Sequence, residues 1–187
     1  NNQLTGQLFD LQNLSSLTAI DLSKNQLTGT IPASIGTLTA MFGITLNLNM
    51  FSGLLPLLKE KSLNYAYMES NLLSGTIPAV YGNLSRLVYL LLDNNHLEGT
   101  IPLEFSALRE LSVLTAQQNH LTGSLQNLFD PLVQTKLDSV LLSSNQLTGT
   151  LPAEVFSLAS LKTFSAATNC FSGSLPITIC NNSLATL

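Results

Sequence analysis

A short block of residues recurs along the whole chain and constrains how it folds. Residues 25–32 read NQLTGTIP, and residues 145–152 repeat this block as NQLTGTLP. The asparagine that opens the block recurs at intervals of 22 to 26 residues. Its eight positions are Asn2, Asn25, Asn49, Asn71, Asn95, Asn119, Asn145 and Asn169. A period of roughly 20–29 residues predicts a solenoid, in which each repeat forms one coil and stacks on its neighbours.

Apolar residues occur at fixed distances from each of these asparagines. Before Asn95 they are Leu87, Leu90 and Leu92, and after it Leu97. The residues five and three places before the asparagine point to the same side of an extended chain, which is the alternation of a β-strand. Each repeat is therefore predicted to give one short strand, and the stacked strands to form a parallel sheet.

The asparagine column and a glycine column are both expected to have structural roles. An asparagine side chain donates and accepts hydrogen bonds, so it can satisfy backbone groups where the chain turns away from the strand. Repeated at the same corner of every coil, the eight amides would form a ladder. A glycine stands four places after each asparagine, as at Gly29 and Gly149. This column indicates a positive φ or a close approach of backbone.

The repeats fill the chain, so residues 1–187 are predicted to form a single domain of about seven to eight repeats. Residues 50–71 are two residues short and residues 120–145 two residues long, and we expect these changes to lie in loops on the outer side of the coils. Both ends of the chain fall inside a repeat without a polar cap, so the domain is expected to be incomplete at both ends.

Composition excludes several kinds of partner. Charged residues make up only 10% of the chain, and the net charge is −4 with seven Lys and Arg residues. Binding to phosphate backbones needs a basic stripe, so nucleic acid is not expected as a partner. No apolar run approaches the roughly 18 residues that span a bilayer, so this segment is not expected to insert into a membrane.

The repeat pattern LxxLxLxxNxLxGxIP, with GNLSRL at residues 82–87, resembles the plant-specific class of leucine-rich repeat. This class occurs in receptor-kinase ectodomains, receptor-like proteins and polygalacturonase-inhibiting proteins, and in secreted proteins of algae and other protists. The resemblance implies an α/β-type solenoid, a right-handed superhelix with a parallel β-sheet on the concave face and an irregular or 3-10 helical convex side. It also implies a second, smaller sheet near the LxGxIP segment. Plant proteins of the class close with paired-cysteine caps, whereas Cys170 and Cys180 lie within the last full repeat, which favours a relative from an alga or another protist.

Two further signals predict passage through the secretory pathway, and hence an extracellular or cell-surface location. Asn13, Asn83 and Asn181 each begin an N-glycosylation sequon, so the protein is expected to be a glycoprotein. Cys170 and Cys180 stand ten residues apart and are predicted to form a disulfide in an oxidising compartment. The alternative is two separate thiols, with that of Cys180 buried.

Catalytic and metal-binding signals are weak. The sequence contains no recognisable Ser-His-Asp grouping or phosphate-binding glycine loop, and its carboxylates are scattered. The protein is therefore not expected to be an enzyme or to hold a cofactor. His96 and His120 share one column in adjacent repeats. Two histidines without further ligands are poor evidence for a metal site, and exposed stacking of the two rings is the favoured interpretation.

The outward-facing side of the predicted sheet holds the candidate binding residues. They are the aromatic, apolar and acidic side chains of two adjacent repeats: Tyr65, Tyr67, Glu69, Tyr89, Leu91 and Asp93. Exposed aromatic residues beside acids are typical of binding surfaces. Ordinary cross-strand packing on a half-exposed sheet is the alternative explanation.

These observations predict a non-catalytic extracellular recognition module that binds a protein, peptide or glycan on its concave sheet. The alternative is a structural component of an extracellular assembly such as a wall, matrix or appendage, packed against other subunits. A third reading is ice binding by a regular array of threonines, because some leucine-rich proteins do this. The threonine column that includes Thr28, Thr122 and Thr148 is interrupted by Glu98 and by serines, which weakens this reading.

Overall fold

The computed structural model describes residues 2–181, which form a stack of coils with two parallel sheets and short 3-10 helices. The seven-stranded sheet consists of β2 (Ala19–Asp21), β4 (Gly43–Thr45), β6 (Tyr65–Tyr67), β8 (Tyr89–Leu91), β10 (Val113–Thr115), β12 (Ser139–Leu141) and β14 (Thr163–Ser165). The eight-stranded sheet consists of β1 (Thr5–Gln7), β3 (Gln26–Thr30), β5 (Met50–Leu54), β7 (Leu72–Thr76), β9 (His96–Gly99), β11 (His120–Ser124), β13 (Gln146–Gly149) and β15 (Cys170–Phe171). The 3-10 helices are η1 (Ala33–Thr37), η2 (Ala79–Asn83), η3 (Leu103–Ala107), η4 (Val155–Ser157) and η5 (Ile177–Asn181).

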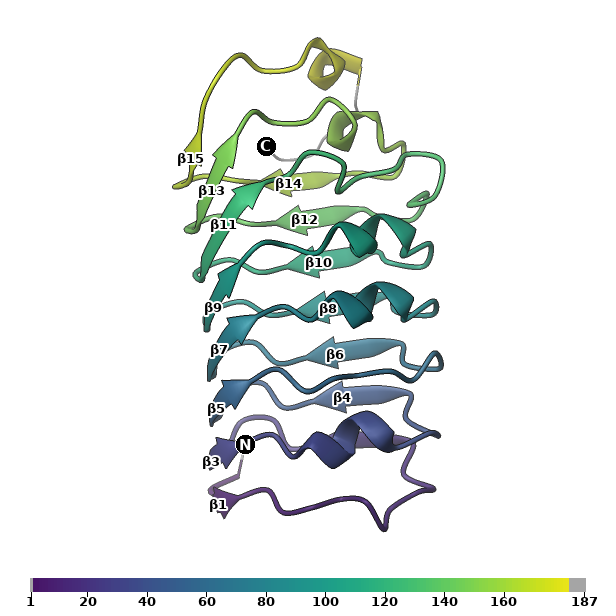
Figure 1. Ribbon diagram of the computed structural model, residues 1–187, viewed down its shortest axis with the longest axis vertical. Helices are drawn as coiled ribbons and strands as arrows, with labels where there is room; N and C mark the ends of the chain where they lie inside the picture. The colour runs from purple at the N-terminus through teal and green to yellow at the C-terminus, as the bar shows by residue number, and fades with distance from the viewer. Residues whose placement is uncertain (1, 182–187) are drawn as a thin grey trace.

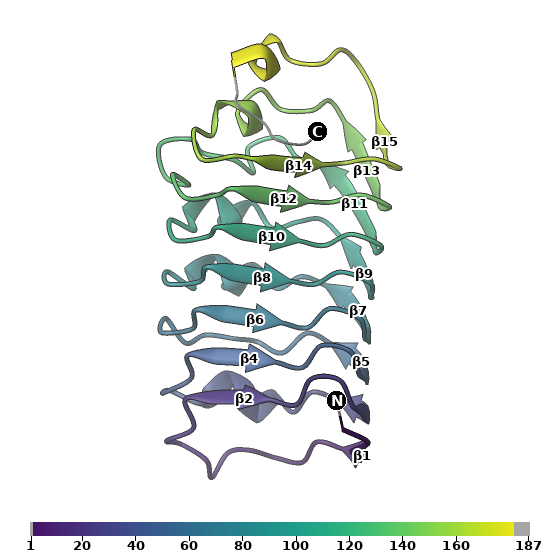
Figure 2. The same ribbon diagram turned by 180° about the vertical axis from the view of Figure 1, so that it is seen from behind.

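The coils give the molecule three long faces. The helices cover the face toward the viewer in Figure 1, and the eight-stranded sheet runs along its left side. The seven-stranded sheet forms the opposite face, which Figure 2 shows from behind. The leucine-rich repeat solenoid predicted from the sequence is therefore confirmed, with β1 at one end of the stack and β15 at the other.

Neighbouring strands of the seven-stranded sheet are parallel and pair without a slip in register. Tyr65 of β6 is aligned with Gly43 of β4 and with Tyr89 of β8, and Tyr67 is aligned with Leu91. Because side chains alternate along a strand, these aligned residues lie on one side of the sheet. The register brings together tyrosines that are 24 residues apart in sequence.

The second sheet is larger than the family resemblance implied. It has eight strands of two to five residues, against seven strands of three residues in the first sheet. The expectation of a smaller second sheet is therefore wrong. The cause is the repeated block itself, whose residues in the six inner strands stay extended from the position after the asparagine to or past the glycine. The glycine has a positive φ in every repeat, between 72° and 89°, as the sequence predicts.

Apolar columns from all coils fill the space between the three faces. Leu87, Leu90 and Leu92 are completely buried and form the core side of one coil. Tyr81 of η2 is also completely buried, and its hydroxyl donates a 2.8 Å hydrogen bond to the carbonyl oxygen of Pro56 in the preceding coil. One continuous core therefore runs through the stack, which is the usual arrangement in repeat proteins.

The two repeats of unusual length differ from the others on the helix-bearing face. The coils through residues 50–71 and 120–145 lack the 3-10 helix that five other described coils have, and their strands keep the common register. The expectation that length changes lie away from the sheet is confirmed. In the longer repeat Gln134 is buried, accepts a hydrogen bond from the Asp130 backbone N–H, and donates one of 3.0 Å to the Phe105 carbonyl.

Candidate ligand-binding face

The corner between the two sheets is held by the asparagine column. The Asn119 amide donates to the carbonyls of Leu92, Ala116 and Gln117, and its Oδ1 accepts a 2.9 Å hydrogen bond from the Leu97 N–H. Six more asparagines bind in the same way to backbone groups of their own coil and of the preceding coil: Asn25, Asn49, Asn71, Asn95, Asn145 and Asn169. Asn2 is exposed at the start of the stack, where its backbone N–H donates to the Lys24 carbonyl. This ladder fixes the seven-stranded sheet in one register.

Four aromatic rings form a continuous cluster on the exposed side of this sheet. Phe42, just before β4, meets Tyr65 edge-on with ring centroids 5.7 Å apart. Tyr65 lies 5.2 Å from Tyr67, and Tyr67 lies 6.3 Å from Tyr89 in a T-shaped arrangement. These separations are in the range of favourable aromatic pairs. We refer to Phe42, Tyr65, Tyr67 and Tyr89 as the aromatic cluster.

A glycine makes room for one ring of the cluster. A Cβ atom added to Gly43 would lie 2.0 Å from Tyr65 Cζ and 2.3 Å from the Tyr65 hydroxyl oxygen. The Tyr65 ring therefore lies directly over the β4 backbone, and Gly43 is buried beneath it. No larger residue fits at this position without moving the ring.

Two acidic side chains lie beside the cluster, beyond the ends of β6 and β8. Glu69 Oε1 accepts a 2.6 Å hydrogen bond from the Asn47 amide of the preceding coil. Glu69 Oε2 and Asn47 Oδ1 are buried and have no hydrogen-bond partner, and they are the only such side-chain atoms among the described residues. Burial raises the pKa of Glu69 above its ordinary value, and the nearby Asp93 carboxylate adds to this effect.

Asp93 is better satisfied than Glu69. Its Oδ2 accepts a hydrogen bond from the Thr115 hydroxyl, and its Oδ1 accepts one of 2.7 Å from the Gln117 N–H. Burial raises the pKa of the Asp93 carboxyl, and these hydrogen bonds oppose the rise. The two acids thus occupy one column in adjacent coils, and only Glu69 keeps an oxygen without a partner.

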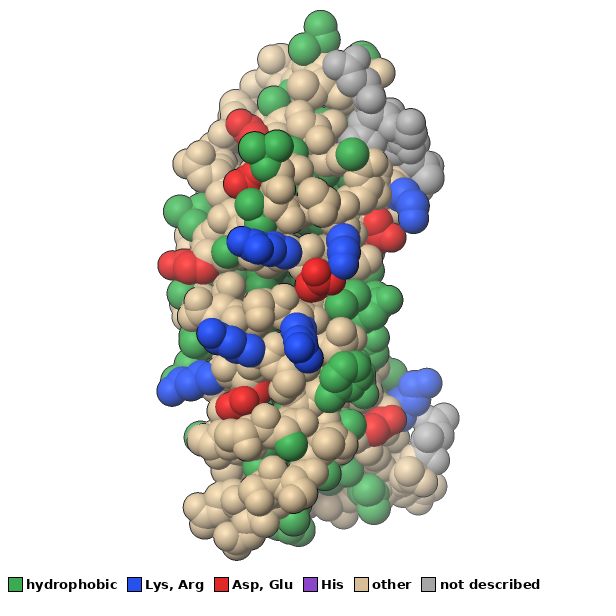
Figure 3. All heavy atoms as spheres, turned by 90° about the vertical axis from the view of Figure 1, so that its right-hand side faces the viewer, with side chains coloured by type: hydrophobic (Ala, Val, Ile, Leu, Met, Phe, Trp, Pro, Cys, Tyr) green, Lys and Arg blue, Asp and Glu red, His purple; other side chains and the backbone are tan. Residues whose placement is uncertain are grey.

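Basic residues lie on a different part of the surface. Figure 3 shows Lys and Arg side chains gathered on the side where the helix-bearing face meets the seven-stranded sheet. Six of the seven basic residues belong to the segments that lead into β6, β8, β10, β12 and β14: Lys59, Lys61, Arg86, Arg109, Lys136 and Lys162. We call this surface the basic edge. It could not be foreseen from the overall composition, and the expectation that nucleic acid is not a partner stays a prediction.

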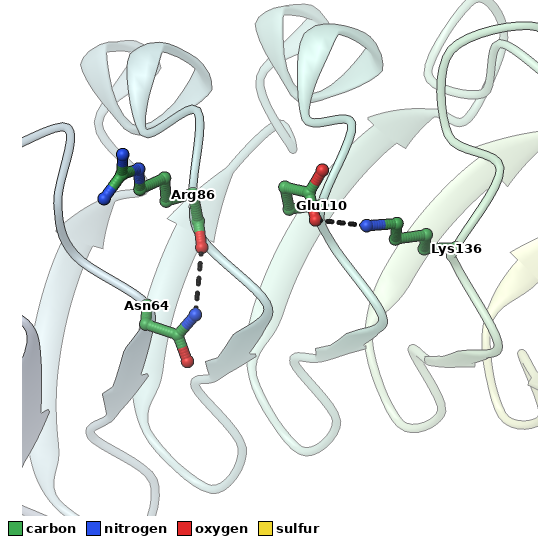
Figure 4. Close-up of polar contacts among 4 residues, drawn as sticks. All are labelled: Asn64, Arg86, Glu110 and Lys136. Carbon is green, nitrogen blue, oxygen red and sulfur yellow. Dashed lines mark hydrogen bonds and ion pairs between the residues drawn. The ribbon is translucent and has the colours of Figure 1, made fainter.

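Two ion pairs and one amide contact connect neighbouring coils at the basic edge. Lys136 pairs with Glu110, and Asn64 donates a 3.3 Å hydrogen bond to the Arg86 carbonyl (Figure 4). Lys162 lies 3.5 Å from an Asp138 carboxylate oxygen. The two lysines are exposed and their acidic partners are partly exposed, so each ion pair contributes little to stability.

Comparisons with known proteins agree with this geometry. Residues 16–38 and 86–108 each match the family model described as Leucine Rich Repeat. The chain is 37% identical over 87 residues to receptor-like protein 41 of Arabidopsis thaliana, a match that spans 44% of this chain and 10% of the relative. It superposes with a TM-score of 0.90 and 31% identity on the plant peptide hormone receptor RGFR1, solved in complex with RGF2, over 97% of this chain and 30% of that one. The chain is a plant-type leucine-rich repeat protein.

A second receptor ectodomain gives the same result for this leucine-rich repeat protein. The receptor kinase GASSHO1/SCHENGEN3 from Arabidopsis thaliana, solved in complex with CASPARIAN STRIP INTEGRITY FACTOR 2, matches with a TM-score of 0.90 and 32% identity. The match covers 97% of this chain and 22% of the receptor's. The chain thus spans only a tenth of its curated relative and less than a third of the two receptor structures.

The structure brings the predicted binding residues of the leucine-rich repeat protein onto one patch. Tyr65, Tyr67, Tyr89 and Leu91 lie on adjacent strands, with the two acids beyond their ends. Sequence reasoning missed Phe42, which belongs to the segment before a strand rather than to an outward-facing strand column. It also left Asn47 unassigned, although its place one coil before Glu69 in the same column was a usable signal.

The predicted disulfide is absent. Cys170 of β15 and Cys180 of η5 are both free thiols, and both are exposed, so Cys180 is not the buried thiol of the alternative either. The reason is the path of the last coil, which carries β15 and η5 on opposite sides of the stack (Figure 1). A disulfide needs Cα atoms about 4.4–6.8 Å apart, and one of the two elements would have to cross the coil to bring them there.

The remaining predicted sites lie on other faces. Asn13 and Asn83 are exposed, and Asn83 is the last residue of η2, away from the seven-stranded sheet. Asn181 ends η5, but its side chain and the rest of its sequon lie outside the described residues. His96 and His120, on the eight-stranded sheet, stack with centroids 6.0 Å apart and planes 8° apart.

Two further features are absent from the described residues. No group of three or more His, Cys, Asp or Glu side chains within residues 2–181 is placed to hold a metal ion. In the same part of the chain, no helix combines the length and apolar character that crossing a membrane requires.

Proposed function

We propose that this chain is a non-catalytic ligand-binding module that works outside the cell or at its surface. Its ligand is a peptide, protein or glycan that lies across the seven-stranded sheet. The observation that carries the proposal is the aromatic cluster, which places four rings side by side on an exposed sheet. Rigid aromatic side chains are the commonest anchors of binding surfaces.

The comparisons support the same proposal. Both matched receptor structures were solved as complexes, one with RGF2 and one with CASPARIAN STRIP INTEGRITY FACTOR 2. The exposed sequons at Asn13 and Asn83 support an extracellular location, because N-glycosylation is a modification of secreted proteins. Glycans at these two sites would leave the seven-stranded sheet uncovered.

Selection of ligands from a displayed random peptide library, and from a glycan array, tests this function. We expect ligands that bind the native chain and lose binding to the double variant Tyr65→Ala plus Tyr89→Ala. The matched control is His96→Ala plus His120→Ala, which removes an exposed aromatic pair from the eight-stranded sheet. Ligands that bind all three proteins equally well would contradict the proposal.

A structural role would give a different result in solution. A component of a wall or matrix would associate with itself or with other subunits, and would select no ligand at the aromatic cluster. Sedimentation of the purified chain over a wide concentration range separates the two outcomes.

A second candidate function is ice binding by the eight-stranded sheet, favoured by one observation that the sequence reading missed. Five places after the ladder asparagines, six of the eight repeats have a hydroxyl residue in or after a strand of this sheet: Thr30, Thr76, Thr100, Ser124, Thr150 and Ser174. The other two repeats have Gln7 and Leu54 at this place. The γ-methyls of Thr76, Thr100 and Thr150 lie close to a glycine of the next coil. Inhibition of ice recrystallisation that is lost in Thr100→Tyr would support this activity, and its absence in the native chain would exclude it.

A further inference from the structure

The seven-stranded sheet carries negative charge and no positive charge on its exposed side. Its outward-facing columns contain Asp21, Glu69 and Asp93, and no Lys, Arg or His. Six of the seven Lys and Arg residues lie on the basic edge, where the ion pairs use Glu110 and Asp138 instead, and the seventh, Lys24, interacts with Asp21. Neither Glu69 nor Asp93 has an ion-pair partner among the described residues. Charge complementarity therefore favours a basic ligand at this face.

Glu69 and Asn47 also both lack a hydrogen-bond donor. Glu69 Oε2 and Asn47 Oδ1 are both acceptors, and both are buried without a donor. Native proteins leave few such atoms, and each one calls for an explanation. An ammonium or guanidinium group supplies N–H donors and no acceptors, so it matches what is missing.

The tyrosines add a second attraction for a cation. Tyr67 lies between Tyr65 and Tyr89 in the cluster and directly precedes the segment that holds Glu69. The face of an aromatic ring attracts a cation within about 6 Å by roughly 0.5–2 kcal/mol, more when the site is shielded from water. The tyrosine rings and the carboxylates thus both favour a positive charge beside Tyr67.

The geometry points to a basic peptide as the ligand of this face, with a Lys or Arg side chain seated against Tyr67 and hydrogen-bonded to the carboxylates of Glu69 and Asp93. This inference rests on the proposed function and narrows it, because it names the chemical group that the sheet recognises. The hydroxyl groups of a neutral sugar could donate hydrogen bonds to these acceptors, but the sugar would leave the negative charge of the two acids unpaired. An acidic peptide would be repelled.

The test uses four short peptides with blocked ends that differ in one central residue. The cationic probes are Gly-Gly-Lys-Gly-Gly and Gly-Gly-Arg-Gly-Gly, and the comparison probes carry Nε-acetyl-lysine or glutamate at the same place. The chain has no tryptophan, and three of its four tyrosines lie in the cluster, so NMR signals of the tyrosine rings report on the site directly. We expect the two cationic peptides to shift these signals in a saturable way, and the other two peptides to leave them unchanged.

Two variants test whether Glu69 is responsible for binding the cationic peptides. Glu69→Gln removes the charge of the side chain and keeps its shape, and we expect it to lower the affinity for the Lys and Arg peptides about tenfold. The matched control, Glu98→Gln, removes an exposed acid from the eight-stranded sheet and should leave binding unchanged. The inference is overturned if the acetylated peptide binds as well as the Lys peptide, if Glu69→Gln binds both cations undiminished, or if neither cation binds at millimolar concentration.

These outcomes separate the inference from the proposed function. If the library or the glycan array selects neutral or acidic ligands that depend on Tyr65 and Tyr89, the sheet is a binding face and the cation inference is wrong. If nothing selected depends on those tyrosines, the proposed function itself fails.

Discussion

The Asn47 amide donates a 2.6 Å hydrogen bond to Glu69 Oε1, while the second oxygen of each group, Asn47 Oδ1 and Glu69 Oε2, is buried without a partner. Two acceptors of this kind cannot satisfy each other. A proton on Oε2 would change that, because a carboxylic acid and an amide form two parallel hydrogen bonds, one in each direction. An amide in place of the carboxylate would do the same permanently.

The first prediction is that Glu69→Gln stabilises the protein at pH 7. The glutamine amide keeps the bond from Asn47, donates to Asn47 Oδ1, and removes a partly buried charge. We expect a gain of about 1 kcal/mol in the free energy of unfolding, measured by urea denaturation. Loss of stability in this variant would show that the new amide group does not reach Asn47 Oδ1.

The second prediction concerns the pH dependence of that difference. The pKa of Glu69 is raised in the folded protein, first by burial and then by Asp93, so the folded state binds its proton more tightly than the unfolded state does. The stability gained from this proton is fully present below the unfolded pKa of about 4.3 and is lost as the pH rises through the folded pKa. The stability gap between Glu69→Gln and the native chain should therefore widen as the pH rises from 4 towards neutrality.

Asp93 titrates in the same sense, because its pKa is also raised, mainly by burial. Its contribution is common to the native chain and to Glu69→Gln, apart from the interaction between the two carboxyls, and largely cancels in the comparison. Denaturation curves recorded at several pH values between 4 and 7 test the prediction. A stability difference that does not change across this range would contradict it.

The third prediction compares two asparagines that make the same bonds at different burial. Asn119 and Asn169 each donate to three backbone carbonyls and accept from one N–H, but Asn119 is 5% exposed, whereas Asn169 is only partly buried. In Asn119→Ala the backbone groups are left without partners and without water, at a cost of about 2–4 kcal/mol. In Asn169→Ala water replaces the amide, so we expect a loss of about 1 kcal/mol in the free energy of unfolding. Urea denaturation measures both, and equal losses would show that shielding from water does not set the strength of the ladder.

The fourth prediction separates two glycines that are crowded by different kinds of neighbour. At Gly43 the three atoms nearest to an added Cβ all belong to the Tyr65 side chain, whereas at Gly82 it lies 2.5 Å from the Glu104 backbone oxygen. A ring can turn away, but the backbone of the next coil cannot. Gly82→Ala should therefore cost about 1–3 kcal/mol of stability, and Gly43→Ala clearly less. Gly43→Ala should instead change the near-ultraviolet circular dichroism of the tyrosines and weaken ligands of the sheet, and an unchanged spectrum would mean that the ring does not lie over Gly43.

The sequence predicts the solenoid and the outward-facing columns because a fixed period determines which residues of different coils align. It brings Tyr65, Tyr67 and Tyr89 together correctly, since aligned positions of adjacent strands are neighbours. The period does not determine where a side chain leans, so it could not place the Tyr65 ring over Gly43 or pair Asn47 with Glu69.

Features that lie outside the strand columns were harder to predict for a similar reason. Phe42 joins the aromatic cluster from the segment before β4, and Gln134 is buried in the one repeat that is two residues too long. The hydroxyl column of the eight-stranded sheet was missed because the second sheet was expected to be small. Such features depend on how consecutive coils pack, which the repeat pattern alone does not give.

The last prediction is that both cysteines are reactive thiols in the purified, unreduced protein. Cys170 and Cys180 are exposed and unpaired in the structure, on opposite sides of the last coil. A thiol-specific reagent such as Ellman's should therefore titrate two thiols per native chain without denaturant. Because neither side chain closes a loop, Cys170→Ser and Cys180→Ser should each change the free energy of unfolding by less than about 0.5 kcal/mol, with or without reductant. If no thiol titrates until reductant is added, and each serine variant then loses about 2–3 kcal/mol, the two cysteines form the bridge that their spacing suggests and the last coil closes on itself.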